Sequence, residues 1–426
     1  MKFGLTFNLL LFLCACRGFC TAAEITAAFT EPVGKLALPQ ALALAEERHP
    51  ELSAARYEKQ AAGDRITQAA AVPNPALSFE AENFGGSGEQ RHFKAAEYTA
   101  QLEQTLELGG KRSKRIRVAT AEDQLSGFDL EAARLDLRAE TIRRFVGVLG
   151  AQAQADLAQE TLTLADNFVQ AVAARVGSGK VSPMELEKAQ ILLAQKKIAH
   201  DQARQTLATA RMQLSAQWGS VLPAFECAVG DLPVLPAAPP PLSDLLLCLP
   251  GNPEVARWAG ELERSRAILA QERAARVPDL TVAAGVRRAN ATDDYTLVAG
   301  VSVPLPIFDR NDGKIKEAEA LLARAEQQRR AAEVKAAAAL AASHQVLSTA
   351  IKRVTALKGD VLPRVKTVFD TVQNGYAQGK YSYLDVLEAQ RTLVETRAEY
   401  IEALVSAHTG SADLERIVGG QLLPLK

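Results

Sequence analysis

Two short stretches of the sequence decide the fold: VGSGKVSPMELEKAQ at residues 176–190 and YAQGKYSYLDVLEAQ at residues 376–390. Both contain Gly-Lys-x-Ser, which is typical of a tight turn between two helices. A second motif, His49-Pro50-Glu51, recurs as Asn252-Pro253-Glu254 at a similar shift of about 200 residues. The chain is therefore a tandem duplication, and each half should contain the same elements in the same order.

The duplication predicts the domain boundaries. We expect a first repeat at 24–230 with its helical turn at 176–183, and a second repeat at 251–420 with its turn at 375–382. Residues 231–250 lie between them and begin with DLPVLPAAPPP, whose prolines cannot continue a helix. This segment is predicted to be an extended linker that joins the repeats.

Four segments alternate apolar and polar residues as β-strands do, at about 76–85, 97–108, 279–288 and 295–305. Between Tyr98 and Leu108 only Gln104 breaks the alternation. A length of about 9 to 11 residues is what a tilted strand needs to cross a bilayer. An ordinary soluble sheet with one buried face is the alternative interpretation.

The predicted helices are unusually long. No proline occurs between Lys111 and Arg175, and a helix of that length would extend for nearly 100 Å. Apolar or bulky residues follow each turn at seven-residue spacing, which indicates coiled-coil packing. They are Leu186, Leu193, His200, Leu207 and Leu214 in the first half, and Val386, Leu393, Tyr400, Ala407 and Leu414 in the second. Gly359 and Pro363 should kink or unwind the long helix of the second half.

The first 23 residues are predicted to be a secretory signal peptide. An apolar run from Phe3 to Cys16 follows Met1-Lys2, and small residues follow as far as Ala23. Cleavage after Ala23 competes with lipidation at Cys16, because the residues before Cys16 loosely resemble a lipoprotein box. No later stretch of 18 apolar residues occurs, so any further membrane crossing should use β-strands.

Composition and motifs argue against several classes of protein. With 49 Lys and Arg against 50 Asp and Glu the net charge is −1, which does not favour nucleic acid binding. The five histidines are scattered, and neither His-x-x-x-His, Cys-x-x-Cys nor a phosphate-binding Gly-rich loop occurs. We therefore expect no enzyme, no cofactor and no dedicated metal site.

Two cysteines remain in the body of the protein. Cys227 and Cys248 flank the linker and would share an oxidising compartment after secretion. A disulfide between them would close the linker loop and stabilise the fold. Two free thiols are the alternative.

Asp385 and Glu388 follow the second turn and are three residues apart, so they share one face of the predicted helix. The simplest interpretation is an acidic pair that the helix dipole favours. In a ring of subunits the same pair would form a ring of carboxylates that attracts cations and constricts a pore.

The sequence resembles the TolC-like outer-membrane efflux factors over essentially the whole mature chain, and in particular their heavy-metal (cobalt-zinc-cadmium) branch. The motifs that carry the resemblance are His49-Pro50-Glu51, Pro73-Asn74-Pro75, Asn83-Phe84-Gly85-Gly86, the run from Gln104 to Arg112, both Gly-Lys-x-Ser turns and the run from Tyr383 to Gln390.

The resemblance implies a mainly α-helical homotrimer. Each protomer would give four strands to a shared twelve-stranded transmembrane β-barrel and four long helical strands to a periplasmic α-barrel. Four strands cannot close a barrel alone, whereas three copies leave no open edge. The protein would lie in the outer-membrane lipid with a long periplasmic extension.

The resemblance also implies site residues and partners. Asp385 and Glu388 would form the pore aperture, although the first repeat has Glu185 and Lys188 at these positions, which reverses one charge. The turns would dock a periplasmic membrane-fusion adaptor that works with an inner-membrane, proton-driven RND pump. The docking residues would be Gly179, Lys180, Ser182, Gly379, Lys380 and Ser382.

The implied function is passive conduction of heavy-metal cations. A duct for drugs, for organic solutes or for type I protein secretion would share the same architecture. A periplasmic coiled-coil scaffold or adaptor would explain the heptads but has no use for four strands of bilayer length.

Overall fold

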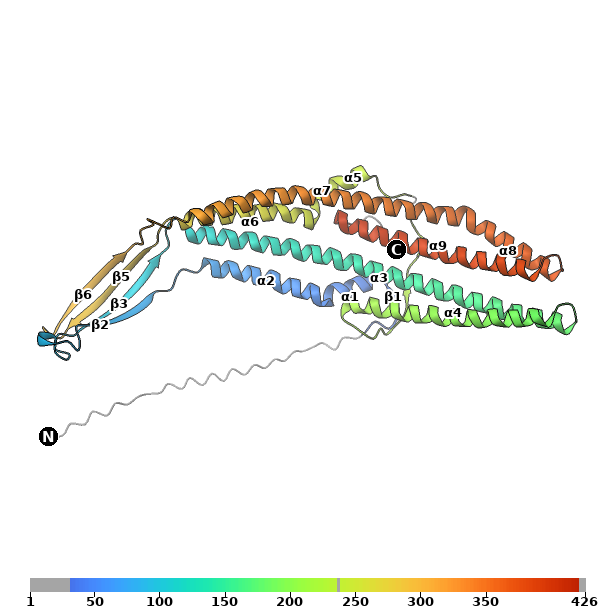
Figure 1. Cartoon of the computed structure of the whole chain (residues 1–426), viewed down its shortest axis with the longest axis horizontal. Helices are drawn as coiled ribbons and strands as arrows, with labels where there is room; N and C mark the ends of the chain where they lie inside the picture. The colour runs from blue at the N-terminus through green and yellow to red at the C-terminus, as the bar shows by residue number, and fades with distance from the viewer. Residues whose placement is uncertain (1–30, 236–237, 421–426) are drawn as a thin grey trace, which may run out of the picture.

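The computed structural model describes residues 31–235 and 238–420. The predicted signal peptide and Cys16 lie outside the described residues. The protomer is elongated, with a four-stranded sheet at one end and two helical hairpins whose turns lie at the other (Figure 1). Within the described ranges, each helix is too short or too polar to cross a membrane.

The large sheet is fully antiparallel, with the strand order β2-β3-β5-β6. Its strands are β2 (Ala76–Glu82), β3 (Glu97–Leu106), β5 (Leu280–Ala289) and β6 (Asp294–Ser302). They lie on the four segments where alternation predicted strands, although β2, β3 and β6 end sooner than expected. The two repeats therefore contribute one β-hairpin each, and β3 and β5 join the hairpins at the centre.

The strand register gathers the apolar side chains on one face of this sheet. Directly opposed residues point to the same face, and Phe79, Ala100, Val286 and Leu297 form one such row across all four strands. Leu297 is 89% exposed, so the protomer itself does not cover this apolar face. The opposite face is polar and includes the ion pair between Arg287 and Glu97 at 3.0 Å.

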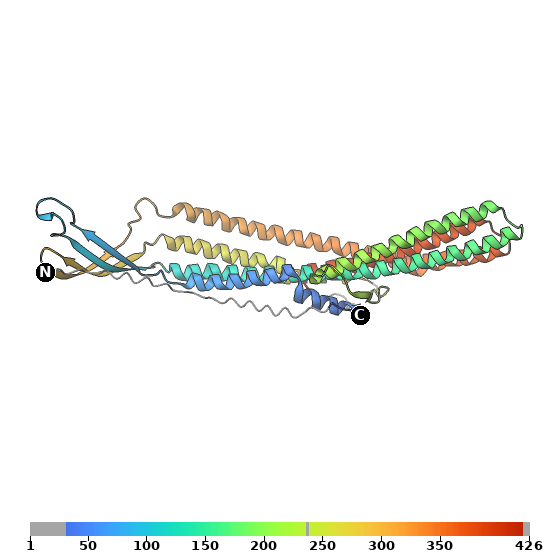
Figure 2. The ribbon, with the colours of Figure 1, turned by 90° about the horizontal axis from the view of Figure 1, so that it is seen from below.

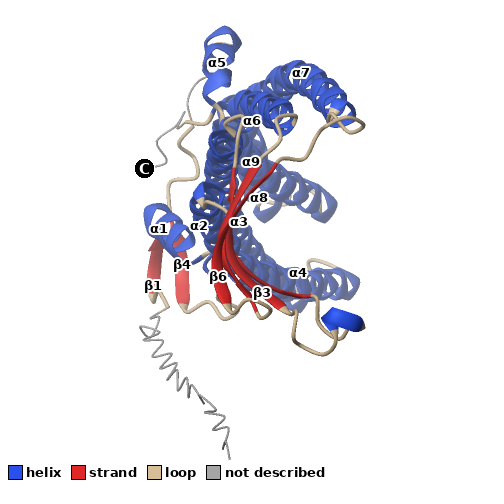
Figure 3. Ribbon diagram, turned by 90° about the vertical axis from the view of Figure 1, so that its left-hand side faces the viewer, coloured by secondary structure: helices blue, strands red, loops and turns tan. Residues whose placement is uncertain are grey.

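The helices form four parallel columns along the molecule (Figures 1 and 2). The long helices are α3 (Lys111–Gly177), α4 (Pro183–Ser215), α7 (Asp312–Ala356) and α9 (Tyr383–Val418), and the shorter ones are α2 (Pro50–Ala70), α6 (Pro253–Ala275) and α8 (Leu362–Ala377). Seen from the sheet end, the columns lie on an arc (Figure 3). The 67 residues of α3 give it a length of about 100 Å.

Two columns consist of two helices stacked end to end. In the second repeat the buried side chain of Asn252 joins α9 to α6. Its Nδ2 donates to the carbonyls of Arg416 and Ile417 at the end of α9, both at 2.9 Å, and its Oδ1 accepts the N–H of Glu254 in α6 at 2.8 Å. One amide thus satisfies free backbone groups at both helix ends.

The first repeat makes the equivalent junction between α4 and α2 without this amide. His49 stands where Asn252 stands in the second repeat, and its side chain makes no capping hydrogen bond to α2. Gly219, which follows α4 and its terminal 3₁₀ turn at Ala216–Trp218, lies beside Pro50. The His-Pro-Glu and Asn-Pro-Glu motifs therefore mark the two places where a short helix begins on the end of a long one.

A smaller unit, which the sequence did not predict, lies near the middle of the molecule (Figure 1) and on one side of the helices (Figure 3). It contains β1 (Gly34–Ala37), which pairs in parallel with β4 (Phe225–Val229), together with α1 (Leu38–Arg48). The main hydrophobic core lies here. Its largest fully buried side chains include Leu36, Phe145, Val148, Leu214 and Leu414.

The inter-repeat linker is anchored by two histidines and contains a short helix, α5 (Leu242–Cys248). Nε2 of His408 lies 2.8 Å from the carbonyl of Leu232, and Nε2 of His344 lies 2.9 Å from that of Pro240. Burial lowers the pKa of His408, although its bond to Leu232 opposes that shift.

The disulfide proposed between Cys227 and Cys248 is not formed in the structure, where both cysteines are free. Cys227 lies in the small sheet on β4, whereas Cys248 ends α5 on a separate part of the molecule (Figure 3). The linker connects β4 to α5, and these two elements lie apart. The two thiols are therefore close to the linker in sequence but not close to each other in space.

A π-helical turn at Leu357–Val361, between α7 and α8, interrupts the long helix of the second repeat where Gly359 and Pro363 predicted a kink or unwinding. Gly359 lies within it, and Pro363 lies in the first turn of α8. Proline has no N–H to donate and crowds the preceding turn, and a widened turn relieves both effects.

The junction at Asn252 should contribute measurably to stability. We expect Asn252→Ala to destabilise the protein by about 2 kcal/mol, because it removes a helix cap and leaves two carbonyls without donors. Asn252→Asp keeps the acceptor and should have an intermediate effect. Thermal unfolding of the detergent-solubilised protein by circular dichroism measures both. His49→Ala is the control, and an equal loss in that variant would contradict the role assigned to Asn252.

Candidate functional site at the hairpin turns

The two Gly-Lys-x-Ser turns have the same backbone structure. Gly179 and Gly379 adopt left-handed conformations with φ of +69° and +77°. The Lys180 N–H donates to the Arg175 carbonyl at 2.9 Å, and the Lys380 N–H donates to the Gly375 carbonyl at 2.8 Å. This is the Schellman arrangement that ends a helix, and it favours glycine because a side chain would be strained there.

The serines of the turns begin the next helices. Ser182 Oγ accepts the N–H of Met184 at 3.2 Å at the start of α4, and Ser382 Oγ accepts the N–H of Asp385 at 3.3 Å at the start of α9. Glycine and serine in both turns thus have a structural reason to be there. Lys180 and Lys380 are the exposed cationic side chains that these two turns present to solvent.

Asp385 belongs to the cap of α9. Its Oδ2 accepts hydrogen bonds from the Ser382 hydroxyl at 2.7 Å and from the Ser382 N–H at 2.8 Å. The hydroxyl first and then the N–H lower the pKa of this exposed carboxyl. Asp385 is therefore a capping residue whose carboxylate stays ionised and remains in contact with solvent.

Glu388 lies one helical turn further along α9 and is exposed. In the first repeat its counterpart Lys188 is also exposed, whereas Glu185, the counterpart of Asp385, is partly buried. The charge difference between the repeats therefore lies on solvent-accessible side chains just above the turns.

An aromatic cluster, which the sequence did not predict, joins the two hairpins above their turns. Phe168 of α3 lies 5.4 Å from the ring of Tyr383 and 5.8 Å from the ring of Tyr376. Val386, the first heptad residue of α9, is buried beside them. The cluster therefore connects α3 of the first hairpin to α8 and α9 of the second.

Arg175 adds a polar contact to the aromatic cluster. Its guanidinium carbon lies 4.5 Å from the centre of the Tyr376 ring, and its Nη1 donates to the Tyr376 carbonyl at 3.2 Å. Burial raises the pKa of the Tyr376 hydroxyl, with Arg175 acting in the opposite direction. A cation placed over an aromatic ring in a partly desolvated site is attractive. The end of α3 is thereby attached to the end of α8.

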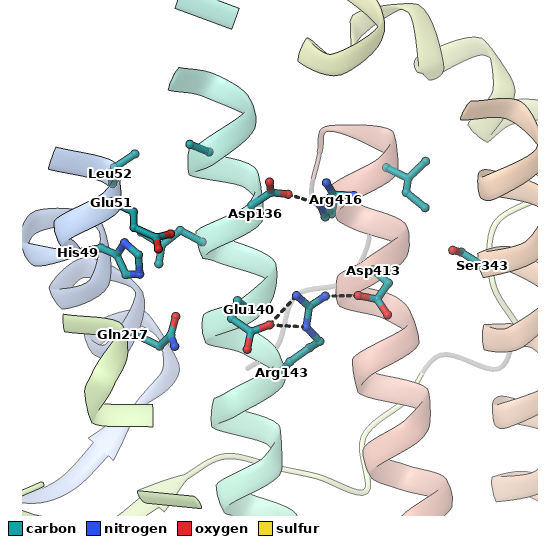
Figure 4. Close-up of a pocket in the computed structure, with 13 residues that line it drawn as sticks. His49, Glu51, Leu52, Asp136, Glu140, Arg143, Gln217, Ser343, Asp413 and Arg416 are labelled. Carbon is teal, nitrogen blue, oxygen red and sulfur yellow. Dashed lines mark hydrogen bonds and ion pairs between the residues drawn. The ribbon is translucent and has the colours of Figure 1, made fainter. Parts of the chain in front are cut away.

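A charged cavity of about 680 Å³ lies midway along the protomer, between the start of α2 and the helices α3 and α9 (Figure 4). Arg143 bonds Glu140 at 2.6 Å and also bonds Asp413, and Arg416 bonds Asp136. Burial tends to raise the pKa of Glu140, but hydrogen bonds from Arg143 and Arg144 outweigh it and lower the pKa. Glu140, Asp413 and Asp136 are thus each paired with an arginine.

The carboxylates and histidines of the described residues do not meet as metal ligands. No group of three or more His, Cys, Asp or Glu side chains in residues 31–235 and 238–420 is arranged to hold a metal ion. In the cavity of Figure 4, the drawn carboxylates of α3 and α9 point to arginines.

The aromatic cluster leads to a prediction about local stability. Phe168→Ala should accelerate amide hydrogen exchange in residues 376–386, because it removes the ring that both tyrosines contact. Phe168→Leu should have a smaller effect, since it retains apolar volume. Exchange in the turn at 178–182 of the first hairpin is the internal reference. Equal acceleration in both turns would contradict a specific link between the hairpins.

Comparison with known proteins agrees with this architecture. The chain is 36% identical to the cobalt-zinc-cadmium resistance protein CzcC of Cupriavidus metallidurans over 91% of each chain. It is 28% identical to the nickel-cobalt-cadmium resistance protein NccC of Alcaligenes xylosoxydans xylosoxydans over 69% of this chain and 65% of that protein. A crystal structure of CusC superposes with a TM-score of 0.77 at 18% identity and covers 90% of this chain and 92% of that one.

The family model described as outer membrane efflux protein matches the chain twice, at residues 41–220 and 247–420. The two matches correspond to the two repeats, and together they cover most of the sequence. The chain therefore belongs to the outer membrane efflux protein family.

Proposed function

We propose that three copies of this chain form the outer-membrane exit duct of a tripartite system that exports heavy-metal cations. The observation that carries the proposal is the 36% identity to a cobalt-zinc-cadmium resistance protein, which extends over 91% of both chains. The two next relatives, NccC and CnrC, are also named for resistance to nickel and cobalt.

The sheet supports a trimer. Strands β2 and β6 each pair with one neighbour only, so both edges of the four-stranded sheet end in unpaired backbone groups. Such edges are satisfied when β6 of one copy pairs with β2 of the next, and three copies close a barrel of twelve strands. The uncovered apolar face would then contact lipid and the polar face would line the lumen.

The helical hairpins support a periplasmic extension with docking partners. Their turns lie at the end of the molecule farthest from the sheet (Figure 1), where an adaptor would meet them. Lys180 and Lys380 are exposed there and can pair with acidic groups of an adaptor. Gly179, Gly379, Ser182 and Ser382 would shape the docking turns. The inner-membrane RND pump would supply the energy, and this chain would conduct passively without catalysing a reaction.

Asp385 and Glu388 would form the acidic aperture. Three copies would place six carboxylates near the periplasmic entrance, where they raise the local concentration of cations. The cap fixes the position of Asp385, whereas Glu388 makes no contact with Ser382 and is exposed. Glu388 is therefore the residue at which charge can be changed with the least disturbance of α9.

The aperture assignment predicts opposite effects at two positions. In planar bilayers, Glu388→Gln should weaken the block of single-channel current by divalent cations, because the carboxylate ring loses charge. Lys188→Glu should strengthen the block, because it makes the first repeat acidic at the equivalent position. Replacing both Asp385 and Glu388 by Ala should also raise conductance. Unchanged block in all three variants would contradict the aperture.

The proposed cargo predicts a selective phenotype. A strain that lacks the gene should become sensitive to some of zinc, cobalt, cadmium, nickel, copper and silver, and the restored gene should reverse this. Growth on a panel of organic toxicants is the control. Sensitivity to organic compounds alone would favour a duct for organic solutes, as in the more distant pyoverdine export protein OpmQ of Pseudomonas aeruginosa, 24% identical. Recovery in the soluble fraction would instead favour a scaffold.

A further inference from the structure

The apolar row of β6 continues beyond the end of the strand. Side chains at alternate positions share one face of a strand, and this row is Tyr295, Leu297, Ala299, Val301, Val303 and Leu305. β6 itself ends at Ser302. Leu305 is 75% exposed and Phe308 is 99% exposed, so the protomer leaves the extension as uncovered as the strand.

The connection between β6 and α7 is an open loop near the ends of the helices (Figure 2). Its apolar part ends at Phe308, and charged residues follow at once with Asp309 and Arg310. Arg310 and Lys314 are exposed. The order from the sheet toward the helices is therefore an apolar strand, an apolar extension and then charged residues of both signs, which matches the order of hydrocarbon and polar interface.

Half of the residues in the extension, three of the six in 303–308, have no free backbone N–H. Pro304 and Pro306 have no N–H, and the N–H of Ile307 donates to the carbonyl of Leu305 at 2.9 Å. A free backbone N–H is costly in an apolar medium, at several kcal/mol each. An extended segment that lies outside a sheet can enter the edge of a bilayer more easily when its donors are absent or already paired.

The height of the apolar surface also favours contact between this extension and lipid. From Tyr295 to Val301 the row rises about 20 Å along the strand, which a tilt of about 40° reduces to about 15 Å. The apolar band of an outer-membrane barrel is about 25 Å tall. Continuing the row to Leu305 adds about 13 Å before the tilt and brings the band to about that height.

The first repeat ends its lipid-facing row differently. After β3 the chain enters α3 through Glu107 to Gly110, and this connection is tied down by polar contacts. Glu107 bonds Arg115 at 3.1 Å, and the N–H of Leu108 donates to Asp279 at 3.1 Å. Leu108 is also less exposed than Leu305, at 40%. The uncovered apolar extension is thus a feature of the second repeat.

We propose that residues 303–308 insert into the periplasmic leaflet of the outer membrane and form the lower rim of the lipid-contacting surface, with phospholipid as the partner. This inference rests on the proposed function, because it continues the face that the duct would turn to lipid. Three copies would place three such segments around the base of the barrel, and Arg310 would meet the lipid phosphates beneath them.

Spin-label accessibility in vesicles of phosphatidylethanolamine and phosphatidylglycerol tests the inference. A full-length chain in which all five cysteines (Cys14, Cys16, Cys20, Cys227 and Cys248) are replaced by Ser receives one nitroxide at a time through Leu305→Cys or Phe308→Cys. Oxygen partitions into lipid, whereas a water-soluble nickel chelate does not. We expect collision rates to be high with oxygen and low with nickel at both positions.

Two matched positions on β6 make the outcomes distinct. Leu297→Cys lies on the apolar face and should match residues 305 and 308, while Thr296→Cys lies on the opposite face and should favour nickel. Nickel access at 305 and 308 with lipid behaviour at 297 would overturn the inference and leave the duct intact. Low collision rates with both reagents would also overturn it, since another copy would then cover the segment. Nickel access at 297 itself would contradict the proposed function.

Discussion

The packing of the other helices along α3 is the interaction on which the rest of the protomer depends. α3 contacts the stacked pair α2 and α4 on one side and the stacked pair α6 and α9 on the other. Small residues allow this close approach. A Cβ on Gly150 would lie 2.5 Å from Cγ2 of Val405, and a Cβ on Gly260 would lie 3.1 Å from Cδ2 of Leu125. A single uninterrupted helix thereby sets the spacing of both repeats and carries the sheet at one end and the turns at the other.

Local patterns predicted the elements well because each depends on residues close in sequence. Alternation of apolar and polar residues located the four strands. The Gly-Lys-x-Ser repeats located the turns, because the left-handed glycine and the capping serine each act on backbone groups within one helical turn. The structure then assigned a second role to Asp385. Its spacing from Glu388 indicated a shared face, but its bond with Ser382 shows a helix cap. The aperture role of Asp385 comes from the family resemblance and is a proposal, whereas the local contacts explain why an aspartate follows Ser382 at this spacing.

The features that sequence did not predict depend on contacts between distant residues. Asn252 was recognised as part of a repeated motif, but its bonds to Arg416 and Ile417 span more than 160 residues. Phe168 carried no signal of its own, because its partners Tyr376 and Tyr383 belong to the other repeat. The disulfide between Cys227 and Cys248 failed as a prediction for a related reason, since nearness to one linker says nothing about which elements carry its two ends.

The π-helical turn at Leu357–Val361 has a consequence for how the two repeats differ. An extra residue in a helical turn rotates everything beyond it by about 100° around the axis. The side chains of α8 are therefore out of phase with those of α7, although the chain continues in the same direction. The uninterrupted α3 keeps a single phase along its whole length. Between this turn and the hairpin turns, the two repeats therefore present different helix faces to their neighbours. A ring of several copies would alternate between two kinds of helix–helix interface.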